Sequence, residues 1–187
     1  MLIGFATLGG CGTRPASAPA TPPAAGPTPA RILSLARVIV LETSGPPPSD
    51  TSVSFTTGTP RTIVLRHGPP ENVVFAKLSL PAAAFADSGR TVTVDVRPRP
   101  GVYGLDLSTS MPLRGGATIT FDYARYFSAP ARARQVYHTD VAFEGALAVG
   151  RILPDNQIEL LPSTHPAPDN LAAGLPAPGS YLVAAPQ

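Results

Sequence analysis

The sequence predicts an all-β fold, an antiparallel β-sandwich preceded by a disordered N-terminal tail. From residue 50 onward apolar and polar residues alternate, which is the two-residue period of a strand with one buried face. Clusters of turn-forming residues separate these segments at short intervals, as in sandwiches and barrels. Proline is also frequent, with 24 among 187 residues. Because a proline inside a helix costs about 3 kcal/mol, the composition disfavours long helices.

The clearest strands lie in residues 91–97 and 117–123. Every second residue in these segments is apolar, so a strand would bury one face and expose the other to water. The inward-facing residues would be Val92, Val94, Val96, Ile119, Phe121 and Tyr123. In a helix the same side chains would scatter around the axis, so the pattern favours strands.

Weaker alternation predicts six further strands. They centre on Val53 and Phe55, on Leu78 and Leu80, on Tyr103 to Leu107, on Val141 to Val149, on Ile158 and Leu160, and on Tyr181 and Val183. The continuous apolar run of residues 63–65 is typical of a central strand. Residues 31–41 fit a helix or a strand, and their β-branched side chains favour the strand. Turn formers at 87–89, 98–101, 114–116 and 154–156 separate the segments.

Composition narrows the classes of function. Charged residues make up 14% of the chain, against roughly 25% in an average soluble domain. The net charge of +2 is too small to indicate a nucleic-acid partner. All 14 basic residues except Lys77 are arginine, which, with abundant Ala, Pro and Gly, indicates the coding bias of a GC-rich genome. The single cysteine excludes a disulfide within the chain.

That cysteine follows an apolar N-terminal segment. Residues 2–10 are apolar and small and lead into Leu8-Gly9-Gly10-Cys11. This motif resembles the lipobox of bacterial lipoproteins, in which a leucine, two small residues and a cysteine mark the cleavage site. The resemblance implies that residues 1–11 are a truncated signal peptide with its lipobox and that Cys11 is the lipidation site. Two or more acyl chains hold a protein stably at a membrane. The residue after the cysteine is Gly12 and not an aspartate, which, by resemblance to the lipoproteins of diderm bacteria, implies the outer membrane.

Residues 12–30 predict a tether between the lipid and the domain. Six prolines and six alanines occupy its 19 positions, without a hydrophobic period. Such a segment favours polyproline geometry at about 3.1 Å per residue, so it could hold a domain up to about 60 Å from the lipid. The β-sandwich domain is then expected over residues 31–187. No stretch approaches the roughly 20 apolar residues of a transmembrane helix.

Five segments in order resemble the ZU-five-type domain, the β-sandwich module of ankyrins, netrin receptors and tight-junction scaffolds. The segments are 78–85, 91–96, 117–123, 157–162 and 179–183. The resemblance implies an immunoglobulin-like architecture and a structural or protein-interaction role. Some relatives cut themselves at a His-Phe-Ser site before the last strand. Here the stretch is Pro178-Gly179-Ser180-Tyr181, and because the histidine is missing the resemblance implies no self-cleavage.

The histidines and several carboxylates are the candidate catalytic or metal-binding residues. We expect His67 and His165 in solvated loops, and Glu144, Asp155 and Glu159 on turns and strand surfaces. His138 and Asp140 lie two residues apart, so on a strand they would share a face and could begin a metal site. No third ligand is marked by spacing, whereas a catalytic zinc site uses three protein ligands. The sequence therefore predicts no catalytic residue, no metal and no cofactor.

Three arginines form the candidate anion-binding site. Arg125, Arg132 and Arg134 lie near aromatic residues in a predicted long loop, residues 125–138. The function expected from the whole sequence is a non-catalytic lipoprotein of the bacterial cell envelope, with an envelope protein as its partner. Two alternatives remain open. One is an envelope hydrolase or metal-dependent enzyme that uses His138 and Asp140, and the other is a small-ligand carrier with a pocket between its sheets.

Overall fold

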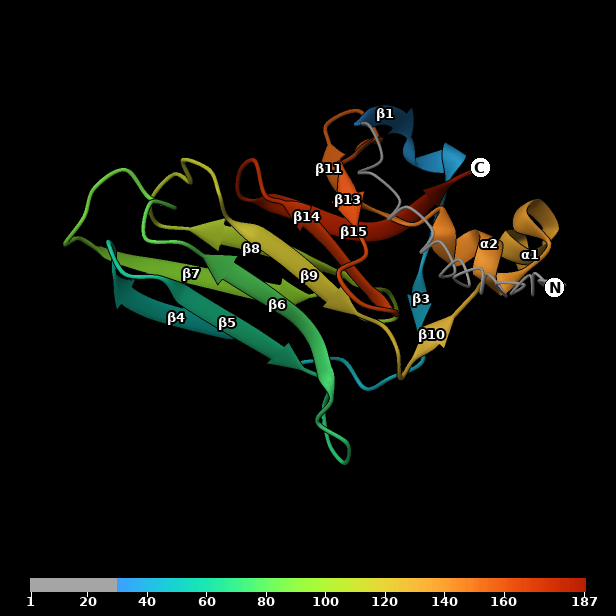
Figure 1. The fold of residues 1–187 in the computed structure, drawn as a ribbon, viewed down its shortest axis with the longest axis horizontal. Helices are drawn as coiled ribbons and strands as arrows, with labels where there is room; N and C mark the ends of the chain where they lie inside the picture. The colour runs from blue at the N-terminus through green and yellow to red at the C-terminus, as the bar shows by residue number, and fades with distance from the viewer. Residues whose placement is uncertain (1–29) are drawn as a thin grey trace, which may run out of the picture.

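A computed structural model describes residues 30–187 (Figure 1). The predicted signal peptide with Cys11 and, apart from Ala30, the predicted tether lie outside these residues. The described part is mostly β, with antiparallel sheets that pack face to face, which confirms the predicted all-β sandwich. None of its helices is long and apolar enough to cross a membrane.

The larger sheet has eight strands and is antiparallel throughout. In spatial order its path is β1 (Arg31–Ser34), β12 (Gln157–Leu160), β11 (Ala148–Leu153), β15 (Gly179–Pro186), β8 (Gly104–Thr109), β7 (Thr91–Pro98) and β4 (Thr51–Thr56), while β2 (Val38–Val40) pairs with β15 off this path. Tight turns join neighbours in the chain. Three residues connect the paired Leu153 and Gln157 between β11 and β12, and two of them, Asp155 and Asn156, have φ values of 60° and 55°, a region that aspartate and asparagine tolerate better than most residues.

The smaller sheet has five strands and covers the other side of the core. Its order is β13 (Ser163–Thr164), β14 (Asn170–Gly174), β9 (Thr118–Asp122), β6 (Val74–Leu80) and β5 (Arg61–Arg66). The prediction that residues 63–65 lie in a central strand is wrong, because β5 is the edge of this sheet and Val64 points outward. A separate two-stranded ladder joins β3 (Glu42–Thr43) to β10 (Phe127–Ser128).

The main core fills the space between the two sheets. The valines at positions 92, 94 and 96 of β7 are fully buried, as the alternation predicts, and so are Ile119 and Phe121 of β9. Aromatic rings close one end of this core, where Phe75 stacks on Tyr103 at 5.3 Å between ring centroids and meets Phe121 edge-on at 5.8 Å. Burying each of these side chains stabilises the fold by about 1.5–3 kcal/mol, so the core holds the two sheets together.

A second, smaller core lies on the opposite face of the larger sheet. The chain runs from β1 through a 3-10 turn (Leu35–Arg37) into β2, and these strands pair with β12 and β15 respectively. The segment therefore folds over this face of the sheet, and it confirms the predicted strand over 31–41, apart from the turn. The core beneath it contains Val38, Ala148, Ile158, Leu160, Leu182 and Ala184. Gly150 lets β11 approach closely, because a Cβ there would lie 2.4 Å from Ile158 Cδ1.

The structure contains two short helices where the sequence predicted a loop and a strand. The predicted loop at 125–138 contains α1 (Ala131–Tyr137), and the predicted strand at 141–149 begins with α2 (Asp140–Gly145). The Thr139 side chain caps α2 by accepting a hydrogen bond from Ala142 N at 3.1 Å. The spacing of Val141 and Phe143 suggested a shared strand face, but in the helix Phe143 is buried and Val141 is 78% exposed. A local cap therefore outweighed a two-residue period.

Candidate functional site

The three arginines of the predicted anion-binding site have separate partners. Arg132, on α1, donates hydrogen bonds to the Ala36 carbonyl at 3.2 Å and to the Gln187 side chain. Arg134, two residues on, forms an ion pair with Asp140 at 3.5 Å. Arg125 lies beyond β9 and pairs with Glu71. Anion binding by these residues stays a prediction, and any anion would compete with these contacts.

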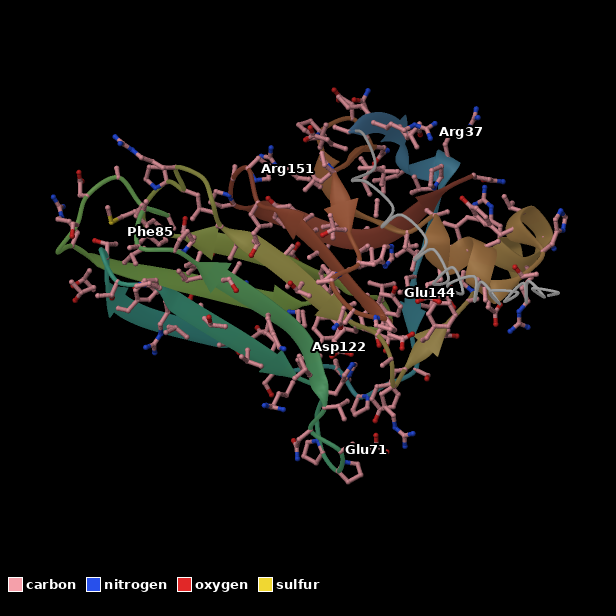
Figure 2. The ribbon with its side chains drawn as sticks, in the orientation of Figure 1. Arg37, Glu71, Phe85, Asp122, Glu144 and Arg151 are labelled. Atoms are coloured by element: carbon pink, nitrogen blue, oxygen red, sulfur yellow. The ribbon has the colours of Figure 1, made fainter. Side chains whose placement is uncertain are left out.

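The ion pair of Arg125 with Glu71 is the shortest among the described residues, at 2.6 Å. Glu71, in the loop between β5 and β6, accepts hydrogen bonds from Arg125 Nε and Nη2, both at 2.6 Å, and from the Tyr126 hydroxyl at 3.1 Å. Figure 2 shows Glu71 near the end of this projecting loop. The hydrogen bonds from Arg125 lower the pKa of Glu71 from 4.5 to about 2, because they favour the carboxylate. The three side chains tie the β5–β6 loop to the segment that follows β9.

This carboxylate should make stability depend on acid pH. Because its pKa falls from 4.5 to about 2 on folding, Glu71 stabilises the protein above pH 4.5. The contribution is lost as the pH falls through the folded value. We expect Glu71→Gln to lower the midpoint of thermal unfolding slightly at pH 6, since the pair is exposed and screened by salt. The gap from the wild type should close between pH 4.5 and about 2. A gap that is the same across this range would contradict the assignment.

His67 is buried, so its predicted place in a solvated loop is wrong. The residue follows β5, and its ring is only 1% exposed, among the rings of Phe75, Tyr103 and Tyr126. Its Nδ1 donates to the Pro46 carbonyl at 2.9 Å. Burial raises the pKa of neighbouring Tyr103 to about 12. These contacts fix the start of the β5–β6 loop, which is a structural role.

His138 and Asp140, the two residues considered as the start of a metal site, do not lie on a strand. His138 ends α1 with a φ of 64°, and its N–H donates to the Arg134 carbonyl at 3.0 Å. Asp140 begins α2 and pairs with Arg134. The two residues therefore share no strand face, because the chain turns between two helices. Within residues 30–187, no group of three or more His, Cys, Asp or Glu side chains could hold a metal ion.

A pocket of about 470 Å³ gathers polar groups that the sequence did not link. It lies between α2 and the loop from β13 to β14, and its lining includes Val141, Glu144, His165 and Asp169. The buried Tyr123 hydroxyl donates to Glu144 Oε1 at 3.2 Å and lies 3.5 Å from His165 Nδ1. Glu144, which belongs to α2, is labelled in Figure 2. No spacing signal could have joined these residues, since they come from the position after β9, from α2 and from a distant loop.

The hydrogen bonds in this pocket depend on the protonation of Tyr123. Burial and the nearby Glu144 carboxylate raise the pKa of Tyr123, so its hydroxyl remains protonated and donates to Glu144. His165 can then interact with the tyrosine oxygen only as a donor through Nδ1. The pocket is open and lies outside the two sheets, unlike the pocket between sheets expected of a carrier. It offers carboxylates beside an apolar wall, without a serine, threonine or cysteine nucleophile among its lining residues.

A third polar cluster surrounds Ser180. Its hydroxyl donates to Asp106 Oδ1 at 2.6 Å, and Arg99 Nη2 donates to the same carboxylate oxygen at 2.8 Å. Partial burial opposes ionisation of Asp106, but the hydrogen bonds from Ser180 and Arg99 outweigh it and lower the pKa. A carboxylate with a lowered pKa is a weak base, so it orients the serine without activating it. Sequence reasoning missed this partner because Asp106 lies 74 residues before Ser180.

Comparisons of the chain with protein-family models, with curated proteins and with solved structures found no match.

Proposed function

We propose that this protein is a non-catalytic interaction module of the bacterial cell envelope, held at the membrane by lipid on Cys11. The observation that supports it best is the position of two consecutive strands. β4 ends the path of the larger sheet, and β5 ends the smaller one. Figure 1 shows both at the lower margin of the sandwich, joined by a short turn. Within residues 30–187, one side of the domain therefore presents two strand edges without a neighbouring strand.

Unpaired edges have a physical consequence. A strand at the edge of a sheet carries N–H and C=O groups without partners in the sheet, and an extended segment of another chain can pair with them. Native domains usually cover such edges or pair them with a strand of another chain. A tethered sandwich with open edges is thus suited to contact another polypeptide.

The polar clusters support a structural role for two carboxylates. The carboxylates of Glu71 and Asp106 have lowered pKa values, because each accepts hydrogen bonds from an arginine and a hydroxyl. A general base works best with a pKa near the operating pH, so these shifts run in the wrong direction for acid–base catalysis. Both clusters instead tie together segments that are distant in the chain.

The proposal is tested in intact bacterial cells fed with labelled palmitate. A photo-crosslinking residue is placed at Val64 in β5 and, as the matched control, at Thr120 in β9, which pairs with a strand on both sides. We expect palmitate on the protein and crosslinks to an envelope protein from position 64. The Cys11→Ser variant should lose the label and these crosslinks. Label that persists in Cys11→Ser, or crosslinks that are equal at both positions, would contradict the proposal.

A further inference from the structure

We propose that the free edge of β5 accepts an extended acidic segment of a partner protein, which adds to the smaller sheet as a sixth strand. The inference rests on the proposed function, since it names the class of partner that the module binds. Two features of β5 carry it. One is the unpaired backbone edge, and the other is the charge of the side chains along it.

The edge is long enough to hold a strand. β5 comprises six residues, Arg61–Arg66, and its partner in the sheet is β6. Six residues span about 17 Å at about 3.4 Å per residue. In an antiparallel pair alternate residues direct their N–H and C=O groups to opposite sides, so about half of these groups in β5 face away from β6. Pro60 precedes the strand, and a register shift follows Leu65, which limits the edge to this segment.

The side chains along this edge are basic. Arg61 and Arg66 are exposed at the two ends of β5, and Val64 is 41% exposed between them. Lys77 of β6 is exposed and lies directly opposite Val64 in the ladder. Neither strand contains an aspartate or a glutamate. Within the described chain no salt bridge involves Arg61, Arg66 or Lys77, so no carboxylate neutralises their charges. Arg66 also donates a hydrogen bond to the Asn72 carbonyl at 3.1 Å, which leaves its charge in place.

A second copy of the chain fits this edge poorly. If β5 paired with its own copy in an antiparallel ladder, each copy would bring Arg61, Arg66 and the neighbouring Lys77 to the junction, and no acidic side chain of β5 or β6 would oppose them. Like charges that are close to each other across a ladder are destabilising. A segment with acidic residues would instead place opposite charges near these basic side chains. Charge complementarity therefore favours an acidic partner over self-association.

The edge of β4 does not offer the same surface. Its six residues, Thr51–Thr56, carry no charge. The nearest basic side chain on the neighbouring strand, Arg97 of β7, lies 3.9 Å from Asp50 and is thus partly neutralised. Both edges can accept backbone hydrogen bonds, but the charges select β5 for an acidic segment.

The test uses the full chain carrying Cys11→Ser and a fluorescein-labelled octapeptide of alternating glutamate and valine. Binding is followed by fluorescence anisotropy. We expect binding to this peptide, and at least about tenfold weaker binding to a lysine–valine peptide. A glutamate–valine peptide with alternate amides N-methylated should also bind at least about tenfold more weakly, because it cannot form the ladder. Equal binding of the methylated peptide would overturn strand addition.

Two charge-reversal variants with the same net charge separate the edge from the rest of the surface. The first is Arg61→Glu/Arg66→Glu/Lys77→Glu, and the control is Arg37→Glu/Arg90→Glu/Arg114→Glu, three exposed arginines outside β5 and β6. We expect the first to weaken glutamate–valine binding at least about tenfold and the control less than about threefold, with unchanged circular dichroism spectra for both. An equal loss in the two variants would show binding to overall charge and would overturn the inference.

Two further experiments test whether a membrane or a second copy of the chain binds the same surface. Vesicles of phosphatidylglycerol that bind the protein through the three basic residues, while the peptide does not bind, would assign the surface to a membrane and overturn the inference. A dimer in analytical ultracentrifugation that the first variant abolishes would assign it to a second copy, with the same consequence. Crosslinks from Val64 in cells without binding of the acidic peptide would contradict only this inference and leave the proposed function standing.

Discussion

Phe121→Ala is expected to lower the free energy of unfolding by about 3–5 kcal/mol, the usual cost of truncating a buried aromatic ring. Phe121 is fully buried on β9, and its ring meets Phe75 edge-on at 5.8 Å. β9 pairs with both β6 and β14, so the strand cannot shift to fill the cavity without disturbing two ladders. Urea denaturation followed by far-UV circular dichroism measures the change.

The matched control for this substitution is Thr120→Ala. Thr120 precedes Phe121 on the same strand and points to the outer face of the sheet, so its truncation should cost less than about 1 kcal/mol. If Phe121→Ala does not fold, Phe121→Leu should still fold and be less stable than the wild type, because it retains part of the buried surface. Equal losses in the Thr120 and Phe121 variants would contradict the assignment of the core.

Ile158→Ala is expected to cost about 2–5 kcal/mol and to loosen the N-terminal strands. Ile158 is fully buried in the second core, and β12 pairs with β1 along four residues. Because the smaller core holds β1 and β2 against the larger sheet, its loss should speed amide exchange in residues 31–40. Hydrogen–deuterium exchange measured by mass spectrometry resolves this segment from the rest of the chain.

Gln157→Ala provides the control for the second core, since Gln157 is exposed on the same strand. Exchange in residues 31–40 should be close to that of the wild type in this variant. Faster exchange in Ile158→Ala across all strands equally would show that the two cores unfold as one unit. Unchanged exchange in residues 31–40 would mean that the second core does not hold the N-terminal strands.

The candidate sites were less predictable than the fold, and the reasons differ from residue to residue. Arg125 was singled out for its charge, but its partner Glu71 lies 54 residues earlier, and their contact joins the β5–β6 loop to the segment after β9. Glu144 was expected on a turn or strand surface, whereas the capped helix α2 brings it to the Tyr123 hydroxyl. The type of a residue indicates which interactions its side chain can form. Which of them it forms depends on the residues that the fold places beside it.

The sequence also did not show whether a strand lies at the edge or in the centre of its sheet. The apolar run at residues 63–65 resembles a central strand, since consecutive apolar side chains are typical of strands buried on both faces. In the structure Ile63 and Leu65 face the core, and Val64 is exposed because no element covers the outer face of β5 at that point. The residues of a strand indicate which of its faces are apolar. They do not indicate whether the strand has a neighbour on one side or on both sides in the sheet.

The sequence by itself determined the β-class of the domain, the inward faces of β7 and β9, and the turns between neighbouring strands. These features depend on residues that are adjacent in the chain, through the two-residue period of a strand and the φ values that glycine, asparagine and aspartate adopt readily. Only the tertiary structure decided the order of the strands, the second core beneath β1 and β2, the burial of His67 and the open edge of β5. Each of these depends on which distant segments come together when the chain folds back on itself, and a local pattern carries no record of that.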